Sequence, residues 1–448
     1  MQKTIGVLLL IGILLIASCS DDEVSEEMFD LKPPTLSGPT AISTTAFSMD
    51  WDEVPGADAY EFDVSERQDF SSFLRAYEAV RENRSNTNVI DLDPATTYYF
   101  RVRTIMGSEV SDNSNVIEVT TDEVAPPEPD TPLKSVADFS VGMAVRAGRL
   151  NGQHEQILVR EYDQITSEFE MKMNIMYPSE GNYNFTQADA TVDWAVENGL
   201  DVHGHALIWH AATPSWVENF SGTDEAFEAM VEDYIKTTVT RYKGKVKSWD
   251  VVNEAFEDGS GELRNSVFRQ RMGDDYIAKC YQWTREADPD VLIFYNDYNM
   301  VVDPVKRGAA IDMVSDFLMR GVPVDGFGFQ MHISHNGPSK SLIASTAQEV
   351  VDLGLLLHFS ELDVRANPGN DISMLTVDRA ISQQEKYKEV VEVYNAIPAA
   401  NKFALTVWGL KDDETWLINF WGHVDWPLMY NSDFSFKKAH TGFLQGLE

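Results

Sequence analysis

Two glutamates in the second half of the chain each stand at the end of an apolar run. Glu254 follows Val251-Val252-Asn253, and Glu361 follows Phe359-Ser360. A carboxylate at the end of a buried strand costs free energy unless it is paired or hydrogen-bonded, so the two glutamates indicate one shared polar site. A carboxylic acid that protonates a leaving oxygen, beside a carboxylate that attacks an anomeric carbon, is the chemistry of glycosidic cleavage. We therefore expect Glu254 to be the general acid/base and Glu361 to be the nucleophile.

Imidazoles, amides and indoles end the neighbouring runs. Asn253 is placed to hydrogen-bond a sugar hydroxyl beside Glu254, and His332 is suited to holding Glu361 ionised and oriented. Indoles stack on the apolar faces of sugars. The other residues at these ends are His203-Gly204-His205, Trp209-His210, Tyr295 to Asn299, Gln330-Met331 and Trp408. A lone glutamate would more simply be a salt-bridge partner or a helix cap, but the coincidence of positions favours a catalytic site.

The elements that carry these residues alternate between short apolar runs and longer amphipathic stretches over residues 133–448. Helices are expected at Asp224–Tyr242, Asp274–Ala287 and Val305–Arg320. Eight strand–helix repeats in this length predict a (β/α)8 TIM barrel, whose functional residues lie at the carboxyl ends of the strands. The eight predicted strands are Phe139–Val145, Ile165–Met173, Asp201–Trp209, Val246–Val252, Val291–Tyr295, Gly326–Met331, Leu355–Leu362 and Phe403–Trp408.

Residues 133–448 resemble glycoside hydrolase family 10, the xylanases, along nearly their whole length. Seven segments in order carry the resemblance: Gly204–His210, Trp249–Ala255, Arg285–Pro289, Asn296–Asn299, Gly328–His332, Ser360–Asp363 and Thr406–Gly409. The resemblance implies an endo-acting, retaining double displacement on the internal β-1,4 bonds of xylan or xylo-oligosaccharides, without a cofactor or metal. The two carboxyl groups are then expected to lie about 5–5.5 Å apart.

The same resemblance implies roles for further residues. Glu168 and Lys172 bind the sugar one place before the cleaved unit, Tyr298 contacts the leaving-group side, and the cleavage subsite is lined by His205, Trp209, Asn253, Gln330 and Trp408, with Trp416 above it. Two positions depart from the family, which has asparagine in place of Phe169 and glutamine in place of Ala212. Both replacements are apolar, so we expect a weaker hold on plain xylose there or extra room for a substituted one.

Rival interpretations remain open at this stage. His203 and His205 on one strand, with His332, are the donors of a metal-dependent barrel hydrolase, although paired histidines in those enzymes usually sit on the first strand. A non-catalytic glycan-binding protein would use the same tryptophans but would have lost a catalytic glutamate. Xylosidase or glucan specificity is the nearest enzymatic alternative.

Residues 35–121 have a different texture, with period-two runs such as Ala46–Trp51, Tyr60–Val64 and Tyr98–Arg103. This pattern predicts an all-β sandwich. Leu92–Tyr98, with Trp51 and Tyr60, resembles a fibronectin type III domain, in which that tyrosine makes a corner hydrogen bond. We expect a spacer module rather than a carbohydrate-binding one. The proline-rich residues 122–132 predict a semi-rigid linker to the barrel.

The first residues predict an export signal. Ile5–Ala17 is an apolar run of secretory length after Lys3, and Ile16-Ala17-Ser18-Cys19 resembles the bacterial lipoprotein signal. Residues 1–18 are then the signal peptide, Cys19 is lipidated and anchors the protein to a membrane, and residues 19–34 form an acidic spacer. Ser20–Glu23 resembles the surface-export signal of Bacteroidetes lipoproteins, which implies an exported lipoprotein of the outer membrane at the cell surface. The sequence leaves open an anchor that faces the periplasm instead. The alternative is an ordinary cleaved signal.

Charge limits the partners. With 35 Lys and Arg against 72 Asp and Glu, the formal net charge is −37, which repels nucleic acid and tolerates a neutral polymer. Cys19 and Cys280 are the two cysteines, so no disulfide framework is expected, and Cys280 is expected to be a buried small apolar residue. We expect a monomer.

Overall fold

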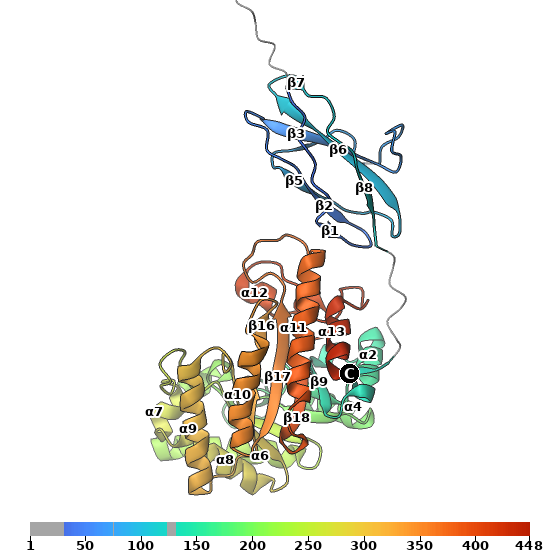
Figure 1. The fold of residues 1–448 in the computed structure, drawn as a ribbon. Helices are drawn as coiled ribbons and strands as arrows, with labels where there is room; N and C mark the ends of the chain where they lie inside the picture. Colours follow the sequence, from blue (N-terminus) through green and yellow to red (C-terminus); the bar gives the residue numbers. More distant parts are fainter. Residues whose placement is uncertain (1–30, 75, 123–130) are drawn as a thin grey trace, which may run out of the picture. The chain divides into compact units, whose positions relative to one another are not determined.

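The structure, a computed structural model, describes residues 31–74, 76–122 and 131–448. The chain divides into two compact units between Val124 and Ala125 (Figure 1). The predicted signal peptide, Cys19, and most of the acidic spacer and of the linker lie outside the described residues. Within the described ranges, no helix has the length and hydropathy of a membrane-spanning segment.

The first unit is all β, as predicted. One antiparallel sheet has the order β1-β2-β5, and the other has the order β4-β3-β6-β7 with β8 also paired to β6. Trp51, Tyr60 and Phe100 lie in its core, and the Tyr98 hydroxyl accepts a hydrogen bond from the Asp93 backbone N–H at 2.9 Å. Its strands are β1 Ala41–Ile42, β2 Phe47–Asp50, β3 Ala59–Ser65, β4 Val80–Glu82, β5 Asn86–Val89, β6 Thr97–Met106, β7 Glu109–Val110 and β8 Ile117–Thr120.

The second unit confirms the predicted (β/α)8 barrel. Eight parallel strands run in the order β11-β10-β9-β18-β17-β15-β14-β13, and pairing of His203 with Ser248 joins β11 to β13 and closes the ring. The strands are β9 Ser140–Val145, β10 Gln164–Ser167, β11 Asp201–Gly204, β13 Ser248–Asn253, β14 Leu292–Asp297, β15 Gly326–Phe329, β17 Leu356–Arg365 and β18 Lys402–Val407, with the short β12 Ile208–Trp209 and β16 His332–Ser334 at the rim. Every residue of β13 is buried, as both faces of a parallel strand require.

Three of the predicted strands differ from the structure by three residues or more, and the other five agree with it to within two residues at each end. The second strand ends at Ser167 rather than Met173, because the Ser167 hydroxyl donates to the Glu170 carboxylate at 2.8 Å and turns the chain. The third strand breaks into β11 and β12, and between them Leu207 N–H donates to Asp250 O at 3.0 Å. The seventh continues to Arg365 because β16 pairs with its end.

Helices cover the outside of the barrel, and α10 and α11 pack against β17 (Figure 1). Helix α6 has the predicted bounds, since Thr223 caps its first turn by accepting from Ala226 N–H. Helix α9 begins at Pro304 and ends at Arg320, and the residue that follows it, Gly321, has a φ of 72°, which suits glycine. The helices are α1 Leu133–Val136, α2 Gly152–Glu161, α3 Met173–Met176, α4 Thr186–Glu197, α5 Ser215–Glu218, α6 Asp224–Tyr242, α7 Val267–Met272, α8 Tyr276–Ala287, α9 Pro304–Arg320, α10 Lys340–Asp352, α11 Val377–Asn395, α12 Leu417–Trp421 and α13 Lys438–Leu447.

Candidate active site

The two predicted catalytic glutamates lie at the carboxyl ends of β13 and β17. Glu361 belongs to β17 and is buried, whereas Glu254 directly follows β13 and is half-buried. Glu254 has a φ of 55°, which is uncommon for a residue with a side chain. Its N–H donates to Asn296 O at 2.9 Å, and its carbonyl accepts from Arg264 Nε at 3.0 Å. These bonds fix the backbone that aims the carboxylate.

A chain of amides links the two carboxylates. Asn296 Nδ2 donates to Glu361 Oε1 at 2.8 Å and to Asn253 Oδ1 at 3.0 Å. Gln330 Nε2 donates to Asn253 Oδ1 at 3.2 Å and to Glu254 Oε1 at 3.0 Å. Four strands, β13, β14, β15 and β17, therefore bring their ends to a single polar site. The expected separation of the two carboxyl groups stays a prediction.

Asn296 was not among the predicted site residues. Its Oδ1 accepts from Ser360 Oγ at 2.6 Å, and a Cβ on Gly328 would clash with that Oδ1. Glycine at 328 thus makes room for the amide that orients Glu361. The signal in the sequence was its place at the end of β14, next to Asp297.

His332 lies between two acids. Its Nδ1 is 2.8 Å from Asp363 Oδ2, and its Nε2 is 3.3 Å from Glu361 Oε2. Burial by itself lowers the pKa of His332, but the charges of and hydrogen bonds to Asp363 and Glu361 outweigh it and raise the pKa to about 10. His332 is therefore an imidazolium at neutral pH, and it brings a positive charge next to the Glu361 carboxyl group.

This pairing predicts a pH dependence. Below about pH 6.5, His332 is protonated in both the folded and the unfolded protein, so its ion pairs make their full contribution to the free energy of unfolding there. As pH rises from about 6.5 to about 10, only the folded form keeps the proton, and the contribution to the free energy of unfolding is lost. We expect His332→Gln to flatten this alkaline decline, measured by urea unfolding at a series of pH values. Equal slopes for wild type and variant would contradict the assignment.

Tryptophans surround the carboxylates. Trp209 Nε1 donates to Glu254 Oε2 at 3.0 Å, and Trp416 Nε1 donates to Asp363 Oδ2 at 3.1 Å. The Trp416 ring centre lies 5.0 Å from that of His332. Trp408 packs edge-on against His205 at 5.4 Å. Each indole therefore lies within the predicted site.

His205 is anchored through Asp250, another residue that sequence reasoning left unassigned. His205 Nδ1 and His203 Nε2 lie 2.9 Å and 3.0 Å from the same Asp250 oxygen. Burial raises the pKa of Asp250, but the two histidines outweigh it and hold that pKa below its usual range. His203 is thus part of the barrel interior, and His205 reaches the site.

The predicted distal subsite lies after β10. Arg146 donates from Nε and Nη2 to the two oxygens of Glu168, both at 2.6 Å, and its guanidinium lies 4.4 Å from the ring centre of Phe169. Lys172 is buried, its Nζ 4.6 Å from the centre of the Trp209 ring. Burial lowers the pKa of Lys172, against the nearby charges of Glu361 and Glu168. The Phe169 ring itself is 42% exposed.

The other departure from the family, Ala212, is buried. The apolar replacement at 169 therefore forms an open surface, whereas the one at 212 is covered by the protein.

Tyr298, the residue predicted to contact the leaving group, directly follows β14. Its hydroxyl accepts from Arg264 Nη2 at 2.6 Å and donates to Asp258 at 2.9 Å, while Lys306 Nζ lies 3.3 Å from the ring centre. Lys306 also pairs with buried Asp297 at 2.7 Å. Burial raises the pKa of Asp297 to about 7, against the charge of Lys306. Arg264 therefore holds both the Glu254 backbone and Tyr298, a role that no pattern in the sequence signalled.

The three histidines of the metal-site alternative do not converge on one point. His203 and His205 face Asp250, whereas His332 faces Asp363 and Glu361. Within residues 31–74, 76–122 and 131–448, no group of three or more His, Cys, Asp or Glu side chains is arranged to hold a metal ion.

Comparison with known proteins gives consistent matches. The profile of Glycosyl hydrolase family 10 matches residues 133–445. The endo-beta-1,4-xylanase Xyn10C of Cellvibrio japonicus is 39% identical over 341 residues, or 69% of this chain and 56% of that protein. The beta-1,4-xylanase of Dictyoglomus thermophilum is 37% identical over 313 residues, or 67% of this chain and 86% of that protein.

Comparison with solved structures also finds xylanases. A mutant xylanase 10C from Cellvibrio japonicus, in complex with xylopentaose, superimposes with a TM-score of 0.71 at 31% identity, covering 92% of this chain and 90% of that one. The chain spans 56% of the length of Xyn10C, and the same share of endo-1,4-beta-xylanase A from Cellvibrio japonicus. With two glutamates joined by amides at the mouth of a closed barrel, and a profile match over residues 133–445, the chain belongs to glycosyl hydrolase family 10.

Proposed function

We propose that this protein is an endo-β-1,4-xylanase that retains the configuration of the anomeric carbon. The observation that carries the proposal is the amide chain from Glu254 to Glu361 through Gln330, Asn253 and Asn296. This chain of amides holds a buried carboxyl group, that of Glu361, and a half-buried one, that of Glu254, in the same site. The relatives named xylanases support xylan as the substrate.

In the first step, a Glu361 oxygen attacks the anomeric carbon while the bond to the leaving oxygen breaks and Glu254 gives that oxygen its proton. The imidazolium of His332 and the Asn296 amide each contact a Glu361 oxygen and orient the side chain. In the second step, Glu254 takes a proton from water, the water oxygen attacks the anomeric carbon, and the ester bond to Glu361 breaks. Glu254 therefore gives up a proton in the first step and takes one back in the second.

The test is hydrolysis of xylan by the purified protein, with and without a chelator, with the products separated by length. Short oligosaccharides of mixed length, formed equally well in the presence of the chelator, are the expected result. Release of xylose alone would favour a xylosidase, and binding without turnover would favour a glycan-binding protein.

The departure at Phe169 leads to a prediction about specificity. Phe169→Asn restores an amide next to Glu168, and one added hydrogen bond is expected to raise kcat/KM on linear xylotetraose about 2- to 10-fold. Phe169→Ala is the matched control, since it removes the ring without adding an amide. Equal values for the two variants would show that the amide does not contact the substrate.

We further propose that the first unit is a fibronectin type III module that acts as a spacer. The Tyr98 hydrogen bond to the Asp93 backbone, at the turn before β6, supports this assignment. Deleting residues 35–121 is then expected to leave hydrolysis of soluble xylan unchanged. A loss of binding to insoluble xylan would instead assign carbohydrate binding to this unit.

The N-terminal residues support a proposal about location. We propose that Cys19 is lipidated and holds a monomeric enzyme on the outer face of the outer membrane. Cys19→Ser removes the thiol that is proposed to be acylated. Because a stable anchor needs two or more acyl chains, the variant is expected to move from the membrane fraction to the soluble fraction. Unchanged membrane association would contradict this, and light scattering of the soluble variant reports the monomer.

A further inference from the structure

An exposed aromatic pair lies on helix α12, which follows β18. Phe420 is 64% exposed and Trp421 is 52% exposed. Among the described residues, Phe169 is the one other Phe, Tyr or Trp that is exposed, and it too lies at the barrel mouth. Large apolar side chains left in water near a binding site indicate a contact that folding does not satisfy. We call Phe420 and Trp421 the α12 platform.

The α12 platform is continuous with the proposed site. The ring centres of His332 and Trp416 are 5.0 Å apart, those of Trp416 and Phe420 are 5.0 Å apart, and those of Phe420 and Trp421 are 5.1 Å apart. His332 in turn contacts Glu361. A row of rings therefore leads from the nucleophile to the protein surface.

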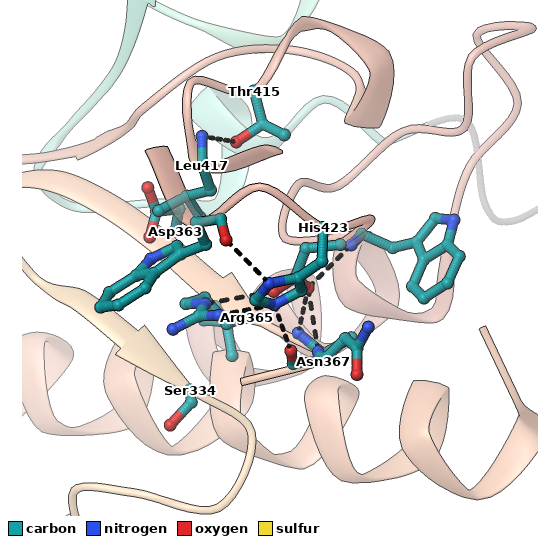
Figure 2. A network of polar contacts seen from close by, with 12 residues as sticks. Ser334, Asp363, Arg365, Asn367, Thr415, Leu417 and His423 are labelled. Atoms are coloured by element: carbon teal, nitrogen blue, oxygen red, sulfur yellow. Dashed lines mark hydrogen bonds and ion pairs between the residues drawn. The ribbon is translucent and has the colours of Figure 1, made fainter. Parts of the chain in front are cut away.

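The platform is held in place by polar contacts behind it. Figure 2 shows Arg365, Asn367 and His423 joined in one network: Arg365 Nη2 lies 3.2 Å from His423 Nε2, which lies 3.0 Å from Asn367 O. The Arg365 guanidinium lies 4.5 Å from the Trp421 ring centre, and Thr415 Oγ1 accepts from Leu417 N–H at the start of α12. The rings are thus preorganised, which lowers the entropy lost on binding.

The order of the strands places the platform beside the substrate path. Around the barrel, β11 and β13 separate β10 from β14 on one side, and β9, β18, β17 and β15 separate them on the other. On the proposed function, the polysaccharide runs from Glu168 after β10 to Tyr298 after β14. Glu361 on β17 and the platform after β18 lie together on one flank. A group reaching the platform must therefore branch sideways from the main chain.

The charge around the platform is balanced. Arg365 Nε donates to Asp425 Oδ2 at 3.1 Å, and the other Asp425 oxygen accepts from Ala366 N–H and Asn367 N–H. Because this buried carboxylate already neutralises Arg365, and the protein as a whole carries −37, an acidic branch gains no partner. The surface suits a neutral sugar whose apolar face packs on the rings.

We propose that the α12 platform binds a neutral pentosyl branch, such as arabinofuranosyl, on the xylan chain being cleaved. The proposal rests on the proposed xylanase activity and makes Phe420 and Trp421 determinants of its specificity. Phe420 packs on Trp416, so changing Phe420 would also disturb the cleavage subsite. The ring contacts of Trp421 do not include Trp416, so Trp421 is the residue to change.

The experiment compares kcat/KM on arabinoxylan, on the same polymer after its branches are removed, and on glucuronoxylan. Trp421→Ala is expected to lower the ratio of arabinoxylan to debranched polymer about 3- to 10-fold. Trp421→Tyr keeps a ring and is expected to keep most of the ratio. Met319→Ala, an exposed apolar residue on the outer helix α9, is the control and is expected to keep all of it. Thermal unfolding of each variant reports its folding, and Trp421→Gln replaces Trp421→Ala if the latter unfolds.

The outcomes separate the two proposals. If wild type does not cleave the debranched polymer, the xylanase proposal fails. If wild type cleaves it but the Trp421 variants keep the wild-type ratio, the platform proposal is overturned and the activity stands. If Trp421→Ala lowers kcat/KM on glucuronoxylan alone, the platform proposal is also overturned, because the branch that it binds would then be acidic.

Discussion

Glu361→Gln is expected to lower kcat on xylan by a factor on the order of 10⁴ to 10⁶. The amide has nearly the shape of the carboxylate but is a poor nucleophile, so no ester to the sugar forms. The amide oxygen can still accept from Asn296 Nδ2, which keeps the side chain in place. The loss therefore reports chemistry rather than unfolding, and circular dichroism with binding of xylopentaose checks that the site persists.

A matched control is Glu385→Gln, which changes an exposed glutamate on α11, outside the strand ends that form the site. It makes the same chemical change and is expected to keep full activity. Activity of Glu361→Gln within about tenfold of wild type would mean that another residue is the nucleophile.

Glu254→Ala is expected to lose a factor on the order of 10² to 10⁴ on xylan, and far less in the first step on an aryl xyloside with a good leaving group. Such a leaving group departs without a proton, so only the second step, in which Glu254 activates water, stays slow. A burst of released phenol followed by slow turnover is then expected, and added azide is expected to speed the slow phase because it needs no general base.

The control for Glu254→Ala is Glu257→Ala, which removes a half-exposed partner of Arg264 three residues along the chain. It is expected to change the rates on the two substrates by the same small factor. Equal losses on xylan and on the aryl xyloside in Glu254→Ala would contradict its role as acid/base, since a positioning role does not depend on the leaving group.

The barrel and the places of the two glutamates could be predicted from the amino-acid sequence. Period and length distinguish strands from helices locally, and the cap at Thr223 fixes where α6 begins, so these elements could be predicted from neighbouring residues. Parallel strands in a barrel share one carboxyl end, and this rule alone places Glu254 and Glu361 at the same mouth of the barrel. The seven matching segments then pointed to one family.

The contacts that hold the site together could not be predicted in this way. Asn296 and Glu361 are separated by 65 positions, and Gln330 and Glu254 by 76, so their hydrogen bonds exist only after the ring has closed. The turn at Ser167 overrode an apolar run that resembled a longer strand. The exposure of Trp421 depends on which loops cover it, and no local pattern records that. Local propensity is a property of adjacent residues, whereas burial, pKa and hydrogen bonding belong to contacts between distant ones.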